Sequence, residues 1–205
     1  MNFFLGISRG IDWFTTKLGQ LMWWTSLVMV LVGAFNVITR YAFPLLSRTF
    51  GDDIAGRLSG NAYLSLQTFA YNLIFMIGAA YVLQSDAHVR VDILFSRLSA
   101  RAKAWVDILG SILFLIPFSI MGIFFSRKYV ASSWSKFELS GDPGGIPFYI
   151  VKTVIPIMFV LLIIQAVSEI IKHIAFLRGH PKSRSVHVIN EEHPGEPITD
   201  QMEAI

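Results

Sequence analysis

The chain is built from long blocks of hydrophobic residues that contain no Asp, Glu, Lys or Arg. Three such blocks, residues 18–39, 58–85 and 108–126, are 22, 28 and 19 residues long. A fourth reaches a comparable length over about 147–168 if Lys152 extends its amine to the interface. Because a helix needs about 20 apolar residues to cross the hydrocarbon core of a bilayer, the pattern predicts an all-α integral membrane protein with four transmembrane helices.

The segments outside these blocks have a different character. Residues 1–17 and 90–107 mix aromatic and aliphatic side chains with basic ones, a pattern typical of amphipathic helices that lie in the membrane interface. Residues 179–205 are rich in Pro, His and charge and poor in hydrophobic residues, which predicts a disordered cytoplasmic tail. The transmembrane domain is therefore expected to cover residues 18–178.

The basic residues predict the orientation of the chain. Four spans place both termini on one side, where ten Lys and Arg residues lie against seven on the other side. The excess of positive charge favours the cytoplasm for both termini. Arg9 and Asp12 follow the short apolar start instead of preceding it, so the first span is interpreted as an uncleaved anchor and not as a signal peptide.

The composition agrees with a membrane protein and limits the chemistry. Hydrophobic residues make up 54% and charged residues 15% of the chain, whereas soluble domains carry about 25% charged residues. There are no cysteines, which excludes disulfides, thiolate metal sites and a cysteine nucleophile. The net charge of +3 comes from basic residues between apolar blocks. These residues are therefore expected to contact lipid headgroups and not nucleic acid.

A search for catalytic patterns predicts no enzyme. Walker, His-Glu-x-x-His and Gly-x-Ser-x-Gly motifs do not occur, and Ser133-Trp-Ser-Lys136 matches Ser-x-x-Lys without its companion motifs. None of the five histidines has a partner four residues away, so no metal or cofactor site is expected. The acidic pair Asp52 and Asp53 is interpreted as part of a solvated loop in preference to a cation site.

The polar residues inside the spans point to helix contacts. The larger ones are amides, namely Asn36, Gln67, Asn72, Gln84 and Gln165. A subunit that moves ions through its own helices usually carries charged residues or broken helices in the membrane. Pro117 and Pro156 are expected to bend the third and fourth spans, but no charge accompanies them. The amides are better suited to helix–helix contact, within the chain or with a partner.

Three segments with recognisable motifs follow one another along the chain. They are Asn36-Val-Ile-Thr-Arg40-Tyr41-Ala-Phe43, then Gly78-Ala-Ala-Tyr81 followed by His88-Val-Arg90-Val-Asp92, and then Glu138-Leu-Ser140-Gly-Asp-Pro143-Gly-Gly145-Ile-Pro147 with Lys152. In this order they resemble the small membrane subunit of the tripartite ATP-independent periplasmic (TRAP) transporters. With Gln165 they extend the resemblance over about residues 20–178. One position departs from the pattern, because Thr68 stands where the family often has a glutamate.

The resemblance implies a function that the residues alone do not supply. Such subunits pair with a large multi-span permease, which carries the substrate and sodium sites, in the bacterial inner membrane. A periplasmic binding protein captures the substrate, typically an organic acid. The small subunit is expected to be a scaffold without a cofactor of its own. The residues alone leave another class open, a stand-alone four-span protein such as a self-assembling channel or a membrane enzyme.

The matched residues are candidates for structural or partner contacts, not for catalysis. Arg40 is expected to reach lipid headgroups or a carboxylate of a partner, with Tyr41 beside it. Arg90 and Asp92 are expected to form an ion pair or cap, and His88 to bond carbonyls at a helix end. The segment with Glu138, Pro143 and Lys152 is expected on the periplasmic side, where it could meet the binding protein.

Overall fold

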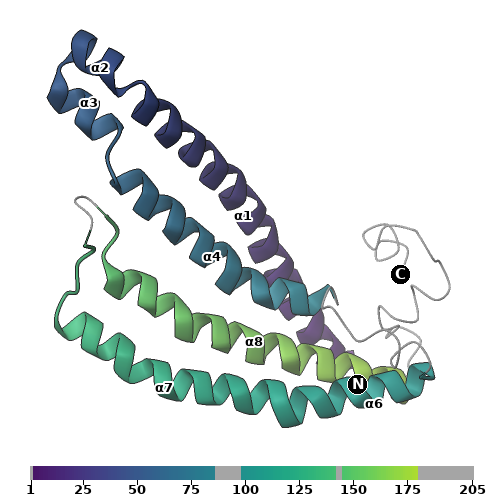
Figure 1. The fold of residues 1–205 in the computed structure, drawn as a ribbon. Helices are drawn as coiled ribbons and strands as arrows, with labels where there is room; N and C mark the ends of the chain where they lie inside the picture. The colour runs from purple at the N-terminus through teal and green to yellow at the C-terminus, as the bar shows by residue number, and fades with distance from the viewer. Residues whose placement is uncertain (1, 86–97, 142–144, 180–205) are drawn as a thin grey trace. The chain divides into compact units, whose positions relative to one another are not determined.

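The computed structural model describes residues 2–85, 98–141 and 145–179, which form helices joined by short turns and contain no strand. Four helical stretches are long and apolar enough to cross a membrane (Figure 1): Phe3–Tyr41, Asp52–Gln84, Ala100–Ser135 and Phe148–Leu177. The predicted class, an all-α protein with four transmembrane helices, is confirmed.

The helices extend beyond the charge-free blocks. Their bounds are α1 Asn2–Tyr41, α2 Phe43–Phe50, α3 Asp52–Leu58, α4 Ala62–Gln84, α6 Ala100–Gly110, the π-helical turn η1 Ser111–Leu115, α7 Ile116–Ser135 and α8 Phe148–Leu177. Residues 2–17 form the first part of α1 without a break. Their place in the membrane interface stays a prediction, as does that of residues 90–107, of which only the last eight lie in α6. The predicted tail lies outside the described residues from residue 180 onward.

Hydroxyl side chains within the apolar helices bond to their own backbone. The Oγ1 atoms of Thr25, Thr39 and Thr68 donate to the carbonyls of Leu21, Phe35 and Leu64, each four residues earlier, at 2.9, 3.0 and 3.0 Å. A bilayer offers no water to an unpaired polar group, so this local bond lets a hydroxyl face lipid. Thr68, at the position of the family's glutamate, is satisfied in this way.

A wider helical turn precedes Pro117. The backbone N–H of Ile116 donates to the carbonyl of Ser111, five residues earlier, and so closes the π-helical turn η1. Proline lacks the N–H that an α-helical turn would use, and its ring crowds the carbonyl four residues before it. The π-turn thus provides space at the point where an uninterrupted α-helix would be strained. Pro156 lies inside α8.

The segment after the first span is helical, not a loop. Pro44 lies in the first turn of α2, and Gly51 joins α2 to α3 with a φ of +85°, a conformation that favours glycine. Asp52 and Asp53 occupy the first turn of α3, where carboxylates interact favourably with the helix dipole. The expected loop was therefore wrong, because the segment is helical, although both side chains are exposed.

The helices contribute to two compact units. The first combines residues 1–17, 79–122 and 159–205, and the second combines residues 18–78 and 123–158. Close packing in the first depends on a glycine, because a Cβ on Gly122 would lie 2.5 Å from the ring of Phe159. In the second, a Cβ on Gly33 would lie 3.0 Å from the Gln67 amide. Small residues are what lets helices approach closely in membranes.

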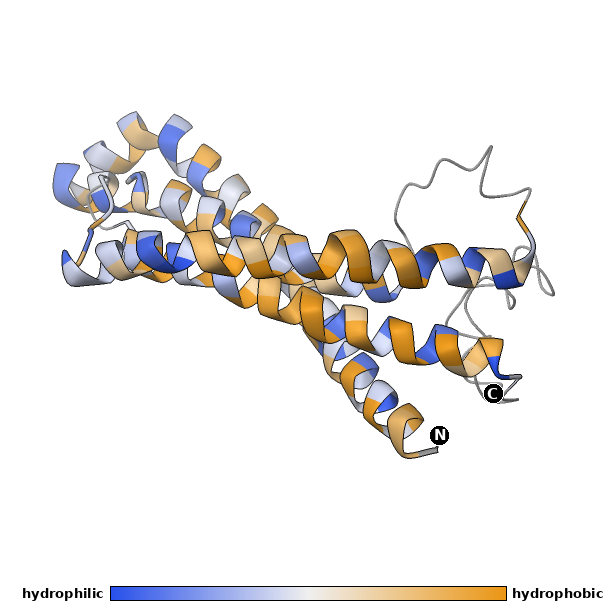
Figure 2. Cartoon of the chain, turned by 90° about the horizontal axis from the view of Figure 1, so that it is seen from below, coloured by the Kyte–Doolittle hydropathy of each residue, from blue (hydrophilic) through white to orange (hydrophobic). Residues whose placement is uncertain are grey.

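Large hydrophobic side chains cover the outside of the helices. Trp23, Phe114 and Phe125 are 82%, 75% and 68% exposed, and the hydrophobic residues dominate the middle of the long helices (Figure 2). In three of the four candidate spans only 11% of the most apolar stretch is buried. A surface of this kind and extent requires a cover of lipid or protein.

Candidate functional site

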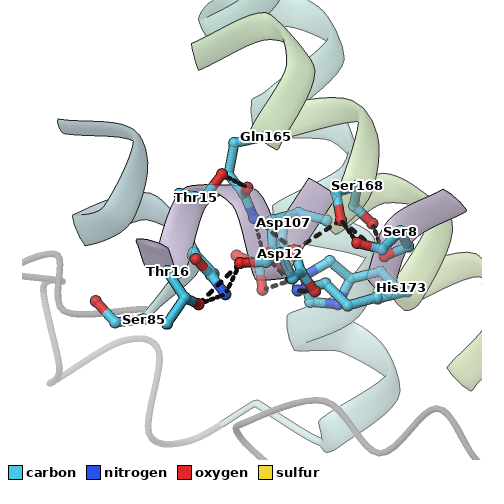
Figure 3. A network of polar contacts seen from close by, with 12 residues as sticks. Ser8, Asp12, Thr15, Thr16, Ser85, Asp107, Gln165, Ser168 and His173 are labelled. Carbon is cyan, nitrogen blue, oxygen red and sulfur yellow. Dashed lines mark hydrogen bonds and ion pairs between the residues drawn. The ribbon is translucent and has the colours of Figure 1, made fainter. Parts of the chain in front are cut away.

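A group of polar side chains joins the start of α1 to the end of α8 within the first unit. We call it the α1–α8 polar network, and its members are Ser8, Asp12, Thr15, Gln165, Ser168, Glu169 and Lys172. The side chains of α1 point towards those of α8 (Figure 3). On α1 the polar residues 8, 12 and 15 are four and three residues apart. On α8 residues 165, 169 and 172 repeat these intervals, with Ser168 next to Glu169. This spacing places each set on one helix face.

Gln165 is the centre of the α1–α8 polar network. Its side chain is fully buried, and its Oε1 accepts a hydrogen bond of 2.9 Å from the hydroxyl of Thr15. Its Nε2 donates to Asp12 Oδ1 and to Glu169 Oε1, both at 3.0 Å. Since a buried amide without partners is costly, this set of bonds fixes the two helices at one register.

Serine hydroxyls extend the network towards the N-terminus. The Oγ atoms of Ser8 and Ser168, both buried, lie 2.7 Å apart. Ser168 also lies 2.9 Å from Asp12 Oδ1 and donates its proton there. Asp12 thus accepts bonds from an amide and a hydroxyl of α8.

One amine serves two carboxylates in the network. Lys172 Nζ lies 2.6 Å from Glu169 Oε1 and 3.1 Å from Asp12 Oδ2. All three side chains are at most a quarter exposed. Because each carboxylate is stabilised by the same amine, removal of Lys172 would leave two partly buried negative charges without it.

Further polar contacts lie next to the network in the same unit. His173 Nε2 on α8 is 3.7 Å from Asp107 Oδ2 on α6, and His173 is buried. Gln84 at the end of α4 donates to the hydroxyl of Thr16 at 2.9 Å and to the carbonyl of Asp12 at 3.1 Å. Side chains of α1, α4, α6 and α8 therefore meet through polar contacts in this unit.

A second polar group lies in the other unit, where the chain passes from α7 to α8. We call it the α7–α8 clasp, formed by Ser133, Glu138 and Lys152. Glu138 Oε2 accepts from the Ser133 hydroxyl at 2.7 Å and from Lys152 Nζ at 2.5 Å. The backbone of Glu138 contributes as well, since its N–H donates to Ser133 and its carbonyl accepts from Phe148.

The turn that carries the clasp has an ionised carboxyl with a lowered pKa and an unusual backbone angle. The hydrogen bonds from Lys152 and then from Ser133 hold the pKa of the Glu138 carboxyl below its usual value. Phe137, just before it, has a φ of +45°, a strained conformation for a bulky residue. Phe137 and Leu139 are 67% and 71% exposed, so the clasp presents an apolar side chain on each side of a fixed carboxylate.

Arg40 and Tyr41 lie at the end of α1, also in the second unit. The Arg40 guanidinium donates through Nη2 to Asn61 Oδ1 at 3.1 Å. Tyr41 is 85% exposed. The amide of the buried Asn36 donates to the carbonyl of Gly60 at 3.3 Å. Both bonds tie the end of α1 to the residues that lead into α4.

The structure brings together some of the residues that the sequence singled out. Glu138 and Lys152 form an ion pair, although the sequence predicted only that they share one side of the membrane. Arg40 and Tyr41 are exposed, as a role in partner or lipid contact requires. His88, Arg90, Asp92 and Pro143 lie outside the described residues, so their predicted roles stay predictions.

Sequence reasoning missed most of the α1–α8 polar network. In the sequence, the charged residues next to the apolar blocks served only to mark where each block ends. They gave no indication that polar residues of α1 contact polar residues of α8. The signal was present, because polar residues recur at helical spacing in both segments: 8, 12 and 15, and 165, 168, 169 and 172. Two polar stripes on otherwise apolar helices predict that the stripes face protein and not lipid.

Comparison with known families decides the identity of the chain. Residues 29–176 match the family model described as tripartite ATP-independent periplasmic transporters, DctQ component. The chain belongs to this family. The resemblance seen in the sequence is thereby confirmed, and this DctQ component is a membrane subunit of a transporter, in a family that is not one of enzymes. No curated protein and no solved structure matches the chain.

The matched residues include the whole α7–α8 clasp but only part of the α1–α8 polar network. Arg40, Glu138 and Lys152 lie within the matched residues, as does the α8 side of the α1–α8 polar network. The α1 side of the network, from Ser8 to Thr15, lies before the matched residues. In this DctQ component the first turns of α1 are thus tied to the matched part of the chain through the network.

Proposed function

We propose that this chain is the small accessory subunit of a sodium-coupled TRAP transporter that takes up organic acids together with a large permease and a periplasmic binding protein. The observation that carries the proposal is the family match over residues 29–176. Membership of the DctQ family implies association with a larger permease, which would hold the substrate and sodium sites. The chain itself would hold no cofactor.

The distribution of charge supports a scaffold in preference to a carrier. Residues 58–85 and 108–126, which form most of two spans, contain no Asp, Glu, Lys or Arg. Asp12 near the start of α1 and Glu169 and Lys172 near the end of α8 bond to one another in the α1–α8 polar network. A path for ions would require ionisable groups or broken helices that face it.

The exposed apolar surface supports a partner in the membrane. Aromatic side chains such as Trp23, Phe114 and Phe125 extend outward from the helices. Lipid tails can cover this surface, and so can the apolar helices of a permease. A scaffold of this kind would act by widening and steadying the permease in the bilayer.

The orientation belongs to the same proposal. We place the chain in the bacterial inner membrane with both termini in the cytoplasm, on the basis of the ten basic residues on that side against seven. The α7–α8 clasp would then face the periplasm, where a binding protein could touch it. Alkaline phosphatase fused after residue 205 should be inactive, and a fusion within residues 136–147 should be active.

Uptake measurements test the function. Deleting this chain from cells that carry the complete transporter should abolish sodium-dependent uptake of one member of a panel of radiolabelled organic acids, and restoring the chain should restore it. A host without TRAP transporters that receives this chain alone should show no uptake. Uptake by the chain alone would contradict the proposal and favour a stand-alone membrane protein.

A further inference from the structure

A pocket of about 450 Å³ lies where the end of α1 meets the start of α4. Its walls are formed by Asn36, Val37, Arg40, Tyr41 and Leu64, which all belong to the second unit. Every lining residue is neutral or basic. Arg40 supplies the one full charge, Asn36 and Tyr41 supply neutral polar groups, and Val37 and Leu64 supply an apolar wall.

The position of Arg40 along α1 corresponds to the level of lipid headgroups. It follows directly after the 22 charge-free residues 18–39. At about 1.5 Å per residue, this run is about as long as the hydrocarbon core is thick, roughly 30 Å. Arg40 is also the basic residue of the last turn of α1, where the helix dipole favours a cation.

The geometry leaves Arg40 able to bind an anion. Its Nη2 donates to the neutral Asn61 Oδ1 at 3.1 Å, and this bond orients the guanidinium without neutralising its charge. The group has five N–H donors in a planar fork that matches phosphate oxygens. Val37 and Leu64, which are 53% and 48% exposed, extend the wall of the pocket with apolar surface suited to an acyl chain.

We propose that this pocket binds an anionic glycerophospholipid, with the phosphate on Arg40 and an acyl chain against Val37 and Leu64. The combination of one unneutralised cation and an apolar wall at the headgroup level carries the choice of a lipid. A phospholipid carries the anion and the apolar chain in one molecule, whereas a partner helix against the wall would in addition have to place a carboxylate at Arg40. A free phosphate would gain nothing from the apolar wall. The bound lipid would thus be part of the folded subunit.

Native mass spectrometry of the delipidated full chain in mild detergent tests the proposal. With phosphatidylglycerol added, the wild-type chain should carry one lipid and should unfold at a higher temperature. Arg40→Gln should lower lipid retention about tenfold, or about 1.4 kcal/mol. The control Arg48→Gln removes a cation from α2, outside the pocket, and should leave retention unchanged. Val37→Trp should block binding by filling the pocket without a change of charge.

Other probes distinguish an anionic phospholipid from a neutral lipid, a free phosphate or a partner protein in the pocket. Diacylglycerol with the same acyl chains lacks the phosphate and should not be retained, and inorganic phosphate should not raise the unfolding temperature. Equal retention by Arg40→Gln and Arg48→Gln would overturn the proposal, as would equal binding of diacylglycerol or equal stabilisation by inorganic phosphate. So would an Arg40→Gln variant that keeps its lipid but loses a co-purifying permease, since Arg40 would then pair with protein.

Discussion

The two polar groups of this chain contain similar residues and differ in their surroundings. In the α1–α8 polar network, Lys172 and its two carboxylates are at most a quarter exposed and join residues about 160 positions apart. In the α7–α8 clasp, Lys152 is only 14% exposed, but Glu138 is 38% exposed and its partners lie within 14 residues. A carboxylate with this access to water gains little from its partner, whereas loss of the amine from the network leaves two carboxylates that are only 16% and 17% exposed without it. The exposure of the carboxylates therefore decides which ion pair contributes more to stability.

The largest effect is expected at Lys172. Lys172→Met should leave Asp12 and Glu169 without their shared amine and should destabilise the chain by about 3 kcal/mol, the lower end of the range for a broken buried pair, because the three side chains keep some exposure. Thermal unfolding of the purified chain, followed by tryptophan fluorescence, measures the loss. Lys128→Met removes an exposed lysine of α7 as a control. An equal shift for both variants would show that the amine of Lys172 does not stabilise the chain.

The next effect concerns close packing in the same unit. Gly122→Ala should cost about 2 kcal/mol, because its Cβ would lie 2.5 Å from the Phe159 ring and force that side chain to move. Gly78→Ala is the matched control, since a Cβ there meets open space and alanine favours a helix over glycine. Unfolding temperatures should fall for the first variant and stay or rise for the second. Equal unfolding temperatures for the two variants would show that the contact between position 122 and Phe159 does not limit the stability of the unit.

A smaller effect is expected at the turn between α2 and α3. Gly51→Ala should cost about 1 kcal/mol, because alanine at a φ of +85° is strained. Gly56→Ala, inside α3 with open space around it, should be neutral or stabilising. Limited proteolysis at the turn measures the local stability of both variants, and faster cleavage is predicted for the first alone.

The smallest effect is expected at the clasp, and it depends on pH. The pKa of Glu138 is held below its usual value by Lys152 and Ser133, so the stabilisation is present above that usual value and is lost as pH falls through the lowered pKa. Glu138→Gln should remove this acid-dependent step. The protection of the amides at positions 138 and 148 against hydrogen exchange, relative to the intrinsic rate at each pH, should therefore fall in acid for the wild type and stay level for the variant. A wild-type protection that does not fall in acid would show that ionised Glu138 does not stabilise the turn.

The sequence was sufficient to predict the four spans, because the cost of placing a charge in a bilayer leaves each span as an uninterrupted apolar block. It was insufficient for the segment around Asp52 and Asp53, where short helices replace the expected loop. The acidic first turn of α3 is a helix signal, but α2 and α3 are much shorter than the apolar blocks from which the spans were predicted.

The polar contacts were harder to predict than the helices. Gln165 was recognised as a residue suited to helix contact, yet its partner on α1 was not, since sequence alone does not say which helices adjoin. Glu138 and Lys152 were both singled out through the family resemblance, but their pairing depends on the turn that Phe137 makes at a φ of +45°. Such a conformation has no signal in the sequence, because bulky residues rarely adopt it.

Purification of the tagged full chain from native membranes in mild detergent, with mass spectrometry of the proteins that accompany it, tests most directly whether this DctQ component is an accessory subunit or a carrier. For an accessory subunit we expect a large multi-span permease at a ratio near one to one. Recovery of this chain alone, reproducibly and in several detergents, would contradict it.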